Sequence, residues 1–405
     1  MLKLYNTLSQ QKEEFKSLDP SGKVARIYVC GVTPYDTSHM GHALVAALFD
    51  VLHRYLEHTG YEVMHVQNLT DIDDDIIKKA RKENQPYEEL GRRWDALYRD
   101  GLRAINCLPF DNYVPASSVI DPIQKMIASL VEKDAAYKAS DGNVYFRASS
   151  FADYGKLSHL DMAQMLEKAR AGAEDSLADF PGNPAKESDL DFILWQAAQP
   201  DEPYWDSPWG NGRPGWHIEC SAISTQSLGQ QFEVHGGGAD LIFPHHSSEI
   251  AQSETYSGKS PVVGYWMHVA MLYLGGEKMS KSLGNLILIN DALKRNSADA
   301  LRIYLLGHEH YRTPLHFTQE GVDQAEKHAD LFRKALAQEA AFGEADVKPY
   351  VERFYAAMDD DLDIPAAVGV MLELAKAVIE NEVDFRGQEH LRYMSNLLGL
   401  PLAQD

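Results

Sequence analysis

A strand–helix–strand pattern near the start of the chain constrains the fold more than any other feature of the sequence. Residues 25–31 (ARIYVCG) are short, β-branched and aromatic, which predicts a buried strand. A polar turn follows, and then apolar residues recur at helical spacing until Gly60, which marks the end of a helix. The apolar positions of this helix are Leu44, Leu48, Val51, Leu52 and Tyr55. Residues 62–67 predict the next strand, and two strands joined by a helix indicate an α/β protein with a parallel sheet.

The remainder of the chain divides around this unit. A length of 405 residues suggests two or three domains rather than one. Helical stretches surround a short strand at 142–146, and the sheet pattern resumes at 232–241 and 262–274. Beyond about 290 the periodicity is helical throughout, which predicts an all-helical end. The predicted parts are a first half of the sheet domain at 1–106, an inserted α/β subdomain at 107–200, a second half at 201–290, and a C-terminal helical bundle at 291–405.

Composition and charge limit the classes of protein. The apolar fraction of 44% supports a sizeable core, and no apolar run approaches the roughly 18 residues of a membrane span. The first residues show no targeting segment, and three cysteines are too few for a disulfide framework, so we expect a cytoplasmic protein. The formal net charge of -22 has the wrong sign for binding nucleic acid through the average field. Any RNA contact therefore requires a local patch.

The string His39-Met40-Gly41-His42 stands where the predicted helix begins. A helix N-terminus carries unpaired N–H groups and positive partial charge, which suit a phosphate. The two histidines can donate hydrogen bonds to phosphoryl oxygens, and Gly41 lets a nucleotide approach the backbone. Alone this pattern is weak, because histidines that only cap the helix explain it equally well.

A second string, Lys278-Met279-Ser280-Lys281-Ser282, lies far downstream and is bounded by glycines. Two lysines three residues apart can neutralise the charge that develops on a triphosphate as pyrophosphate leaves. An isolated pair of this kind would indicate a basic surface turn. The full string, in the same chain as His39–His42, argues for ATP chemistry instead.

Together the two strings resemble the signature pair of the class I aminoacyl-tRNA synthetases. The resemblance implies a Rossmann-type catalytic domain that binds ATP with Mg²⁺ and orients a carboxylate toward the α-phosphate. It implies catalytic roles for His39, His42, Lys278 and Lys281, and ATP contacts from Gly41, Met279 and Ser280.

Two cysteines, a histidine and a glutamate form a further candidate set. Cys30 ends the first predicted strand, Cys220 lies in a predicted helix, and His245 and Glu249 share one helical face. Such donors suit a tetrahedral zinc ion. Their spacing matches no compact zinc-binding pattern, so on spacing alone buried cysteines and a surface His–Glu pair are the preferred explanation.

The strings YVCGVTPYD, SHMGHA, GRPGWHIECSAI, VHGGGADLIFPHHSSEIAQSE and EKMSKSLGN resemble the cysteinyl-tRNA synthetase family, and the likeness runs from residue 1 to about 400. The resemblance implies one zinc ion per chain that binds the thiolate of L-cysteine, with the ligands Cys30, Cys220, His245 and Glu249. It implies ATP contacts from His235, Gly236, Gly237, Gly238 and Asp240, and cysteine contacts from Thr33, Thr70 and Trp216. Core packing is the alternative role for Trp216. Cys107 matches no ligand position and is expected to be structural.

The C-terminal end departs from the family pattern, because the chain stops with the helical bundle where the family continues into an anticodon-binding domain. This shorter architecture resembles the mycothiol-pathway cysteine ligase, which transfers cysteine to the amine of an amino-sugar. Residues 32–36 (VTPYD) favour that ligase, whereas Glu249 and His235 favour the synthetase. We therefore expect a monomeric cysteine-activating ligase without membrane contact, whose slightly favoured acceptor is a small amine. The alternative acceptor is tRNA-Cys, and a non-catalytic synthetase-like binding protein is a remote alternative.

Overall fold

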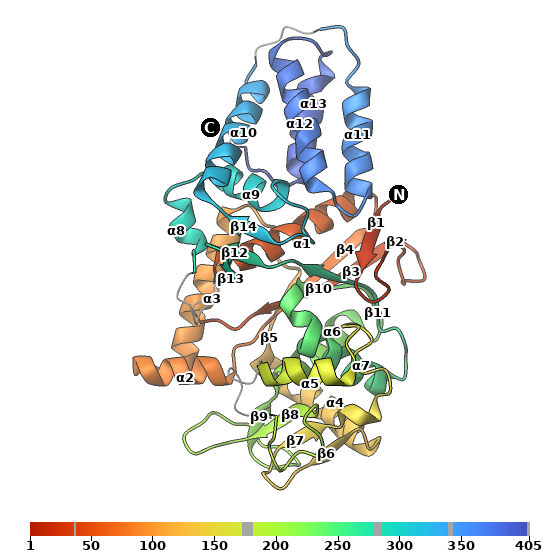
Figure 1. The fold of residues 1–405 in the computed structure, drawn as a ribbon, viewed down its shortest axis with the longest axis vertical. Coiled ribbons are helices and arrows are strands. Elements are labelled where there is room, and N and C mark those ends of the chain that lie inside the picture. Colours follow the sequence, from red (N-terminus) through yellow and green to blue (C-terminus); the bar gives the residue numbers. More distant parts are fainter. Residues whose placement is uncertain (36–37, 172–180, 279–285, 339–342, 403–405) are drawn as a thin grey trace.

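The computed structural model describes residues 1–35, 38–171, 181–278, 286–338 and 343–402, and Figure 1 shows them in three parts along the long axis of the molecule. The predicted strand–helix–strand unit lies in the central part. It consists of β3 (Val24–Val32), α1 (Met40–His58) and β4 (Glu62–Leu69). The two strands pair in parallel, with Val24 opposite Glu62 and Val29 opposite Gln67. The predicted α/β fold is therefore confirmed at its starting point.

The central sheet is parallel and carries the candidate site. Within the described residues it has five strands in the order β11-β10-β3-β4-β5. The further strands are β5 (Asn112–Pro115), β10 (Phe232–Gly238) and β11 (Val263–Val269). The chain winds outward from β3 through β4 and β5, and returns later to place β10 on the other side of β3. Parallel sheets bind ligands at the carboxyl ends of the strands where the winding reverses, which here is between β3 and β10.

Helices α2 (Asp74–Glu83) and α3 (Tyr87–Ala104) follow β4, and α3 packs against α1. The inserted part lies below them in Figure 1 and has an antiparallel sheet in the order β6-β7-β8-β9. Its elements are α4 (Ile120–Glu132), β6 (Ala136–Lys138), β7 (Val144–Phe146), α5 (Met162–Ala171), β8 (Phe192–Ala197) and β9 (Gly212–Pro214).

The bounds of the insertion differ from the predicted 107–200 at both ends. β5 pairs with β4 in the central sheet, so the insertion begins only after Pro115. β9 pairs with β8 in the inserted sheet, so the insertion ends at Pro214. Both strands are short and contain a proline, which has no backbone N–H donor and is unfavourable inside a sheet. Neither segment therefore shows the alternating pattern by which a strand is predicted from sequence.

The second half of the sheet domain begins directly with α6 (Trp216–Leu228). After β10, the chain at Ile242–His246 is kinked at Phe243, whose backbone is extended (φ -142°, ψ 130°), and it leads into α7 (Ser247–Ser257) and then β11. A small sheet joins this half to the C-terminal part: β12 (Leu272–Leu274) pairs with β13 (Glu277–Lys278) and, in parallel, with β14 (Leu315–Phe317). β14 corrects the prediction that the chain is all-helical beyond 290, because three residues are too few for a periodic signal.

The C-terminal part is otherwise the predicted helical bundle and lies at the upper end of Figure 1. Its helices are α8 (Ile289–Leu293), α9 (Ala298–Gly307), α10 (Gln319–Leu336), α11 (Lys348–Asp359), α12 (Ile364–Ile379) and α13 (Arg386–Leu397). Asp361 and Leu362 have φ values of 63° and 50°, which breaks the predicted helical run 350–380 into α11 and α12.

The acidic residues at this break bind the N-terminal hairpin of β1 (Lys3–Asn6) and β2 (Gln11–Glu14). The Asp361 carboxylate is buried and accepts hydrogen bonds from the Tyr5 backbone N–H at 2.7 Å and from Arg312 Nε at 2.8 Å. Lys12 pairs with Asp360 at 2.7 Å. The acidic run therefore has an internal structural role.

Buried Arg302 joins the bundle to the sheet domain. Its guanidinium forms an ion pair with Asp50 of α1, donates to the Leu398 carbonyl at 2.6 Å, and donates to the Ile105 carbonyl at 2.9 Å. Cys107 Sγ lies 3.5 Å from the same guanidinium, as expected for a structural thiol. Among the described residues, no helix is both long and apolar enough to cross a membrane.

Candidate active site

A buried cluster of Cys30, Cys220, His245 and Glu249 lies near the carboxyl end of β3. Cys30 belongs to β3, Cys220 to the second turn of α6, and Glu249 to the first turn of α7. Cys30 Sγ lies 3.8 Å from Cys220 Sγ and 3.5 Å from Glu249 Oε1, and His245 Nε2 lies 3.1 Å from the same oxygen. One donor atom from each residue lies within 4.8 Å of the others. The structure therefore brings together four residues that spacing could not join.

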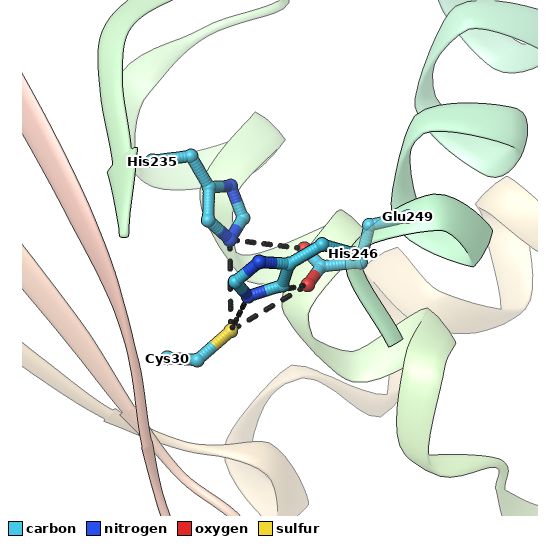
Figure 2. Close-up of side chains that lie close together, drawn as sticks. All are labelled: Cys30, His235, His246 and Glu249. Atoms are coloured by element: carbon cyan, nitrogen blue, oxygen red, sulfur yellow. Dashed lines mark hydrogen bonds and ion pairs between the residues drawn. The ribbon is translucent and has the colours of Figure 1, made fainter. Parts of the chain in front are cut away.

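A second set of four shares Cys30 and Glu249 and adds His235 and His246 (Figure 2). His246 Nε2 lies 3.2 Å from Cys30 Sγ, and His235 Nε2 lies 3.5 Å from both Cys30 Sγ and Glu249 Oε2. Both sets cannot hold separate ions, because they share two of their four donors. The cluster is thus one candidate metal site with a choice of ligands.

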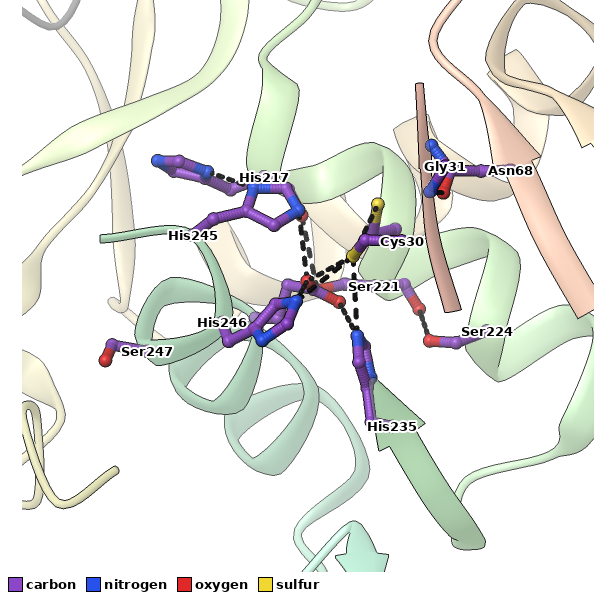
Figure 3. Close-up of polar contacts among 12 residues, drawn as sticks. Cys30, Gly31, Asn68, His217, Ser221, Ser224, His235, His245, His246 and Ser247 are labelled. Atoms are coloured by element: carbon purple, nitrogen blue, oxygen red, sulfur yellow. Dashed lines mark hydrogen bonds and ion pairs between the residues drawn. The ribbon is translucent and has the colours of Figure 1, made fainter. Parts of the chain in front are cut away.

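Further histidines surround this cluster, and sequence reasoning assigned no role to them. His217 Nδ1 lies 2.8 Å from His245 Nδ1 (Figure 3). His246 Nδ1 lies 2.8 Å from His268 Nε2. Thr7 Oγ1 in turn lies 2.7 Å from His268 Nδ1. A metal-binding histidine normally has its second ring nitrogen held by such a partner. The sequence offered one signal for these residues, the adjacent pair His245 and His246. If one of them binds the metal, the other must lie close to the site.

The electrostatics of the cluster favour negatively charged donors. Burial alone would raise the pKa of the Glu249 carboxyl, but the neighbouring His235 and His245 hold it well below its usual range. Burial would lower the pKa of His245, but Glu249 and Cys220 raise it to about 10. Burial and the neighbouring Cys220 raise the pKa of the Cys30 thiol. Burial also opposes ionisation of Cys220, but the hydrogen bond from Cys30 and the nearby charge of His245 lower the pKa of this second thiol. These pKa directions favour the ionised forms of Cys220 and Glu249, which are the forms that bind a metal ion.

The turn His39–His42 begins α1 as predicted. His39 is the N-cap residue, and its Nδ1 accepts a hydrogen bond from the Gly41 backbone N–H at 3.2 Å. The His39 and His42 rings stack with their centroids 3.7 Å apart at an interplanar angle of 24°. His39 therefore does cap the helix, and the same turn directs both imidazoles to the N-terminal end of α1. Their contact with phosphate stays a prediction.

The second ATP motif lies largely outside the described residues. Lys278 ends β13, whereas Met279, Ser280 and Lys281 are not described. The chain after the motif is attached to the first motif: Met40 N donates to the Ile287 carbonyl at 2.9 Å, and Ile289 N donates to the Ser38 carbonyl at 2.7 Å. The described chain that follows the second motif is therefore attached to the start of α1. The contacts of the lysines remain predictions.

The predicted adenosine platform follows β10. The His235 side chain is 1% exposed, stacks on Trp266 with ring centroids 4.4 Å apart, and lies in the second candidate set of metal donors. Its expected contact with ATP stays a prediction. A side chain at Gly236 would collide with Phe49 of α1, so packing explains the first glycine. ATP contacts from Gly237, Gly238 and Asp240 remain predictions.

The three residues expected to contact cysteine lie on elements that border the cluster. Trp216 is 43% exposed and stacks on His245 with ring centroids 4.2 Å apart, which argues against plain core packing. Thr70 follows β4 and is buried, and its Oγ1 accepts a hydrogen bond from Asn68 Nδ2 at 3.1 Å. Thr33 follows β3 directly, and its carbonyl accepts from Tyr35 N at 2.8 Å.

Comparison with known families agrees with this fold and site. Residues 16–327 match the family model for the class I (C) tRNA synthetase catalytic domain, and residues 353–403 match the DALR domain. The protein is therefore a class I aminoacyl-tRNA synthetase, an ATP-dependent ligase. The cysteine–tRNA ligase of Dehalococcoides mccartyi is 46% identical over 409 residues, which covers 99% of this chain and 86% of the relative. The cysteine–tRNA ligase of Alkalilimnicola ehrlichii is 46% identical over 380 residues, covering 93% and 79%. The chain belongs to the cysteinyl-tRNA synthetase family, which confirms the predicted resemblance.

Solved structures support the fold at low sequence identity. Mycobacterium tuberculosis methionyl-tRNA synthetase in complex with methionyl-adenylate has a TM-score of 0.65 at 14% identity, covering 94% of this chain and 89% of that chain. A leucyl-tRNA synthetase complex from Agrobacterium radiobacter has a TM-score of 0.63 at 13% identity, covering 96% and 85%. The predicted Rossmann-type domain with a helical C-terminal part is thereby confirmed.

Proposed function

We propose that this protein is a cysteine–tRNA ligase, which joins L-cysteine to AMP with release of pyrophosphate and then transfers the cysteinyl group to tRNA-Cys. Membership of the family supports the reaction class. The observation that carries the choice of amino acid is the buried cluster of Cys30, Cys220, His245 and Glu249. Cys30 lies near the end of β3, the strand that leads to the predicted phosphate-binding turn at the start of α1.

Zinc is the metal that this donor set fits. Two sulfurs, one imidazole nitrogen and one carboxylate oxygen, all buried and within 4.8 Å of one another, match the ligand types and number of a tetrahedral zinc site. We prefer this set to the one with His235 and His246, because a second thiolate favours a soft ion more than another imidazole does. His217 then orients His245 through the contact between their Nδ1 atoms.

The metal accounts for selection of cysteine over serine. The two amino acids differ by one heavy atom, and an apolar pocket would separate them by only ~1–3 kcal/mol. Zinc, when bound, supplies a Lewis acid that takes a thiolate in preference to a hydroxyl. Trp216, stacked on His245, and Thr33 and Thr70 at the ends of β3 and β4 border the remaining space for the amino acid.

The residues proposed for ATP act by position and charge. The N–H groups at the start of α1, with His39 and His42, are suited to hold phosphoryl oxygens, and Gly41 leaves room for them. Lys278 and Lys281 would balance the charge of the leaving pyrophosphate with Mg²⁺. Holding the carboxylate of cysteine in line with the α-phosphate is then sufficient for much of the rate enhancement.

The comparisons support tRNA-Cys as the acceptor better than the small amine that the sequence architecture slightly favoured. The relatives aligned over nearly the whole chain are cysteine–tRNA ligases, and the C-terminal helices match the DALR domain. The small amine has no support from these relatives.

Charging of a tRNA-Cys transcript with radiolabelled cysteine tests this proposal. We expect acid-precipitable product with L-cysteine and ATP, and none with a tRNA-Ser transcript. In ATP–pyrophosphate exchange we expect activity with L-cysteine and none above background with L-serine. Exchange without charging, together with formation of a cysteinyl amide on an amino-sugar, would establish the small-amine reading instead.

A further inference from the structure

The candidate metal site offers two overlapping sets of donors to one ion. Both sets include Cys30 and Glu249. The Glu249 carboxylate faces the two sets with different oxygens: Oε1 lies 3.1 Å from His245 Nε2, and Oε2 lies 3.5 Å from His235 Nε2 (Figure 2). Oε2 is buried and accepts no well-aligned hydrogen bond from a residue that the structure describes. The shared donors allow an ion to move between the two sets without leaving Glu249.

A small cavity adjoins one of the two sets. Its volume is about 10 Å³, which is about enough for one water molecule. Residues of α6 and α7 contribute to its lining, which includes His235 and Glu249 but neither Cys220 nor His245. The other polar residues that line it are Ser224, Thr225, Gln230 and Ser253. The cavity therefore leads to the donor set that contains His235.

The lining of this cavity extends from the surface to the buried cluster. Gln230 is exposed, Ser253 is half-buried, and Glu249 is buried. Ser253 lies one turn beyond Glu249 on α7, and a helical turn rises by about 5.4 Å, so the path is short. Hydroxyl and amide oxygens along it can replace waters that an ion loses, whereas an apolar wall would exclude a charged ion. The cavity is therefore suited to the passage of a metal cation.

The other donor set is covered by Trp216, which stacks on His245 with ring centroids 4.2 Å apart and belongs to the predicted amino acid site. We propose that the cavity between α6 and α7 is the path by which the metal ion reaches the buried cluster, and that His235 and Glu249 form the first metal position on it. The ion then moves to the set completed by Cys220 and His245, because a second thiolate favours a soft ion. This inference rests on the proposed function, which takes zinc to reside in that set.

The test measures how fast the zinc-loaded enzyme exchanges its metal with an excess of an enriched stable zinc isotope, by mass spectrometry of the desalted protein. We expect Ser253→Leu to slow this isotope exchange by roughly 10-fold or more, because the larger side chain fills the cavity. Its zinc content at equilibrium should equal that of the wild type. Thr255→Leu places the same side chain at a half-buried α7 residue outside the lining, and it should exchange zinc at the wild-type rate. A wild-type rate in Ser253→Leu, or equal slowing in both variants, would overturn the inference.

Two further variants keep the inference testable if Ser253→Leu does not fold. Thr225→Leu fills the cavity from α6 and should also slow isotope exchange. His235→Gln removes the imidazole of the first metal position, so it should slow isotope exchange and keep its zinc. Loss of zinc from His235→Gln would make His235 a permanent ligand and would reject its role on the path. If the wild-type enzyme holds no zinc, the proposed metal site fails and this inference fails with it, whereas unchanged rates in zinc-loaded variants reject the path alone.

Discussion

The Sγ atoms of Cys30 and Cys220 lie 3.8 Å apart, although 190 residues separate them in the sequence. A bound metal ion would explain why the fold brings two free thiols together beside His245 and Glu249. We expect Cys220→Ala to lose bound zinc and to lose L-cysteine-dependent exchange. Zinc content of the purified protein by atomic emission, together with the exchange rate, measures both effects.

Two matched variants define the ligand set. Cys107→Ala removes a thiol that lies against Arg302 instead of the cluster, so its zinc content should equal that of the wild type. His246→Ala belongs to the competing set with His235 and should retain zinc if Cys220 is the fourth ligand. Loss of zinc from His246→Ala with retention in Cys220→Ala would assign the site to the competing set.

The sequence predicted the fold more completely than the site. Helical periodicity located α1, and short runs rich in β-branched and aromatic residues located the strands on either side of it. It missed β5, β9 and β14, which are too short to alternate. The candidate metal site depends on contacts between β3, α6, the turn before α7 and α7 itself, and no local sequence pattern encodes such a convergence. Family resemblance joined the four residues, but it assigned no role to His217 or His268.

The buried ion pair between Asp50 and Arg302 predicts a large effect on stability. Arg302→Met leaves the Asp50 carboxylate with its ion pair to the partly exposed Arg54 and the hydrogen bond from the Leu108 backbone N–H. We expect a loss of about 3–5 kcal/mol in the free energy of unfolding, since removing one partner strands a buried charge. Denaturant unfolding measures the change. The control Arg353→Met breaks an ion pair with Glu373 in which both side chains are half exposed, and it should cost at most about 1 kcal/mol. Equal losses in the two variants would contradict the role of Arg302.

His65 predicts how stability depends on pH. Burial, with a smaller contribution from His53, lowers the pKa of His65 to about 3 in the folded protein, against ~6.5 in an unfolded chain. The folded state thus binds the proton less readily, so its contribution is complete above about pH 6.5 and is lost as the pH falls toward about 3. Within that window, His65 should lower the free energy of unfolding by up to about 1.4 kcal/mol for each unit by which the pH falls. Unfolding curves of His65→Leu at pH 7 and pH 5 should show a smaller difference than those of the wild type, and the same difference would refute the assignment.

Lys281 tests whether activation and metal binding are separable. Its predicted partner is the triphosphate, whereas the proposed zinc ligands Cys30, Cys220, His245 and Glu249 have no predicted ATP contact, so Lys281→Ala should keep its full zinc content. Removing one preorganised positive charge from the site of pyrophosphate release should slow exchange by about 10²- to 10³-fold, with a smaller effect on KM for L-cysteine. Lys281→Arg keeps the positive charge but carries it on a larger, planar group, so this variant should recover part of the exchange rate. Steady-state exchange with saturating cysteine and varied ATP separates kcat from KM. A wild-type exchange rate in Lys281→Ala would show that this lysine takes no part in the reaction. Loss of zinc in the same variant would show that cysteine activation and metal binding are not separable.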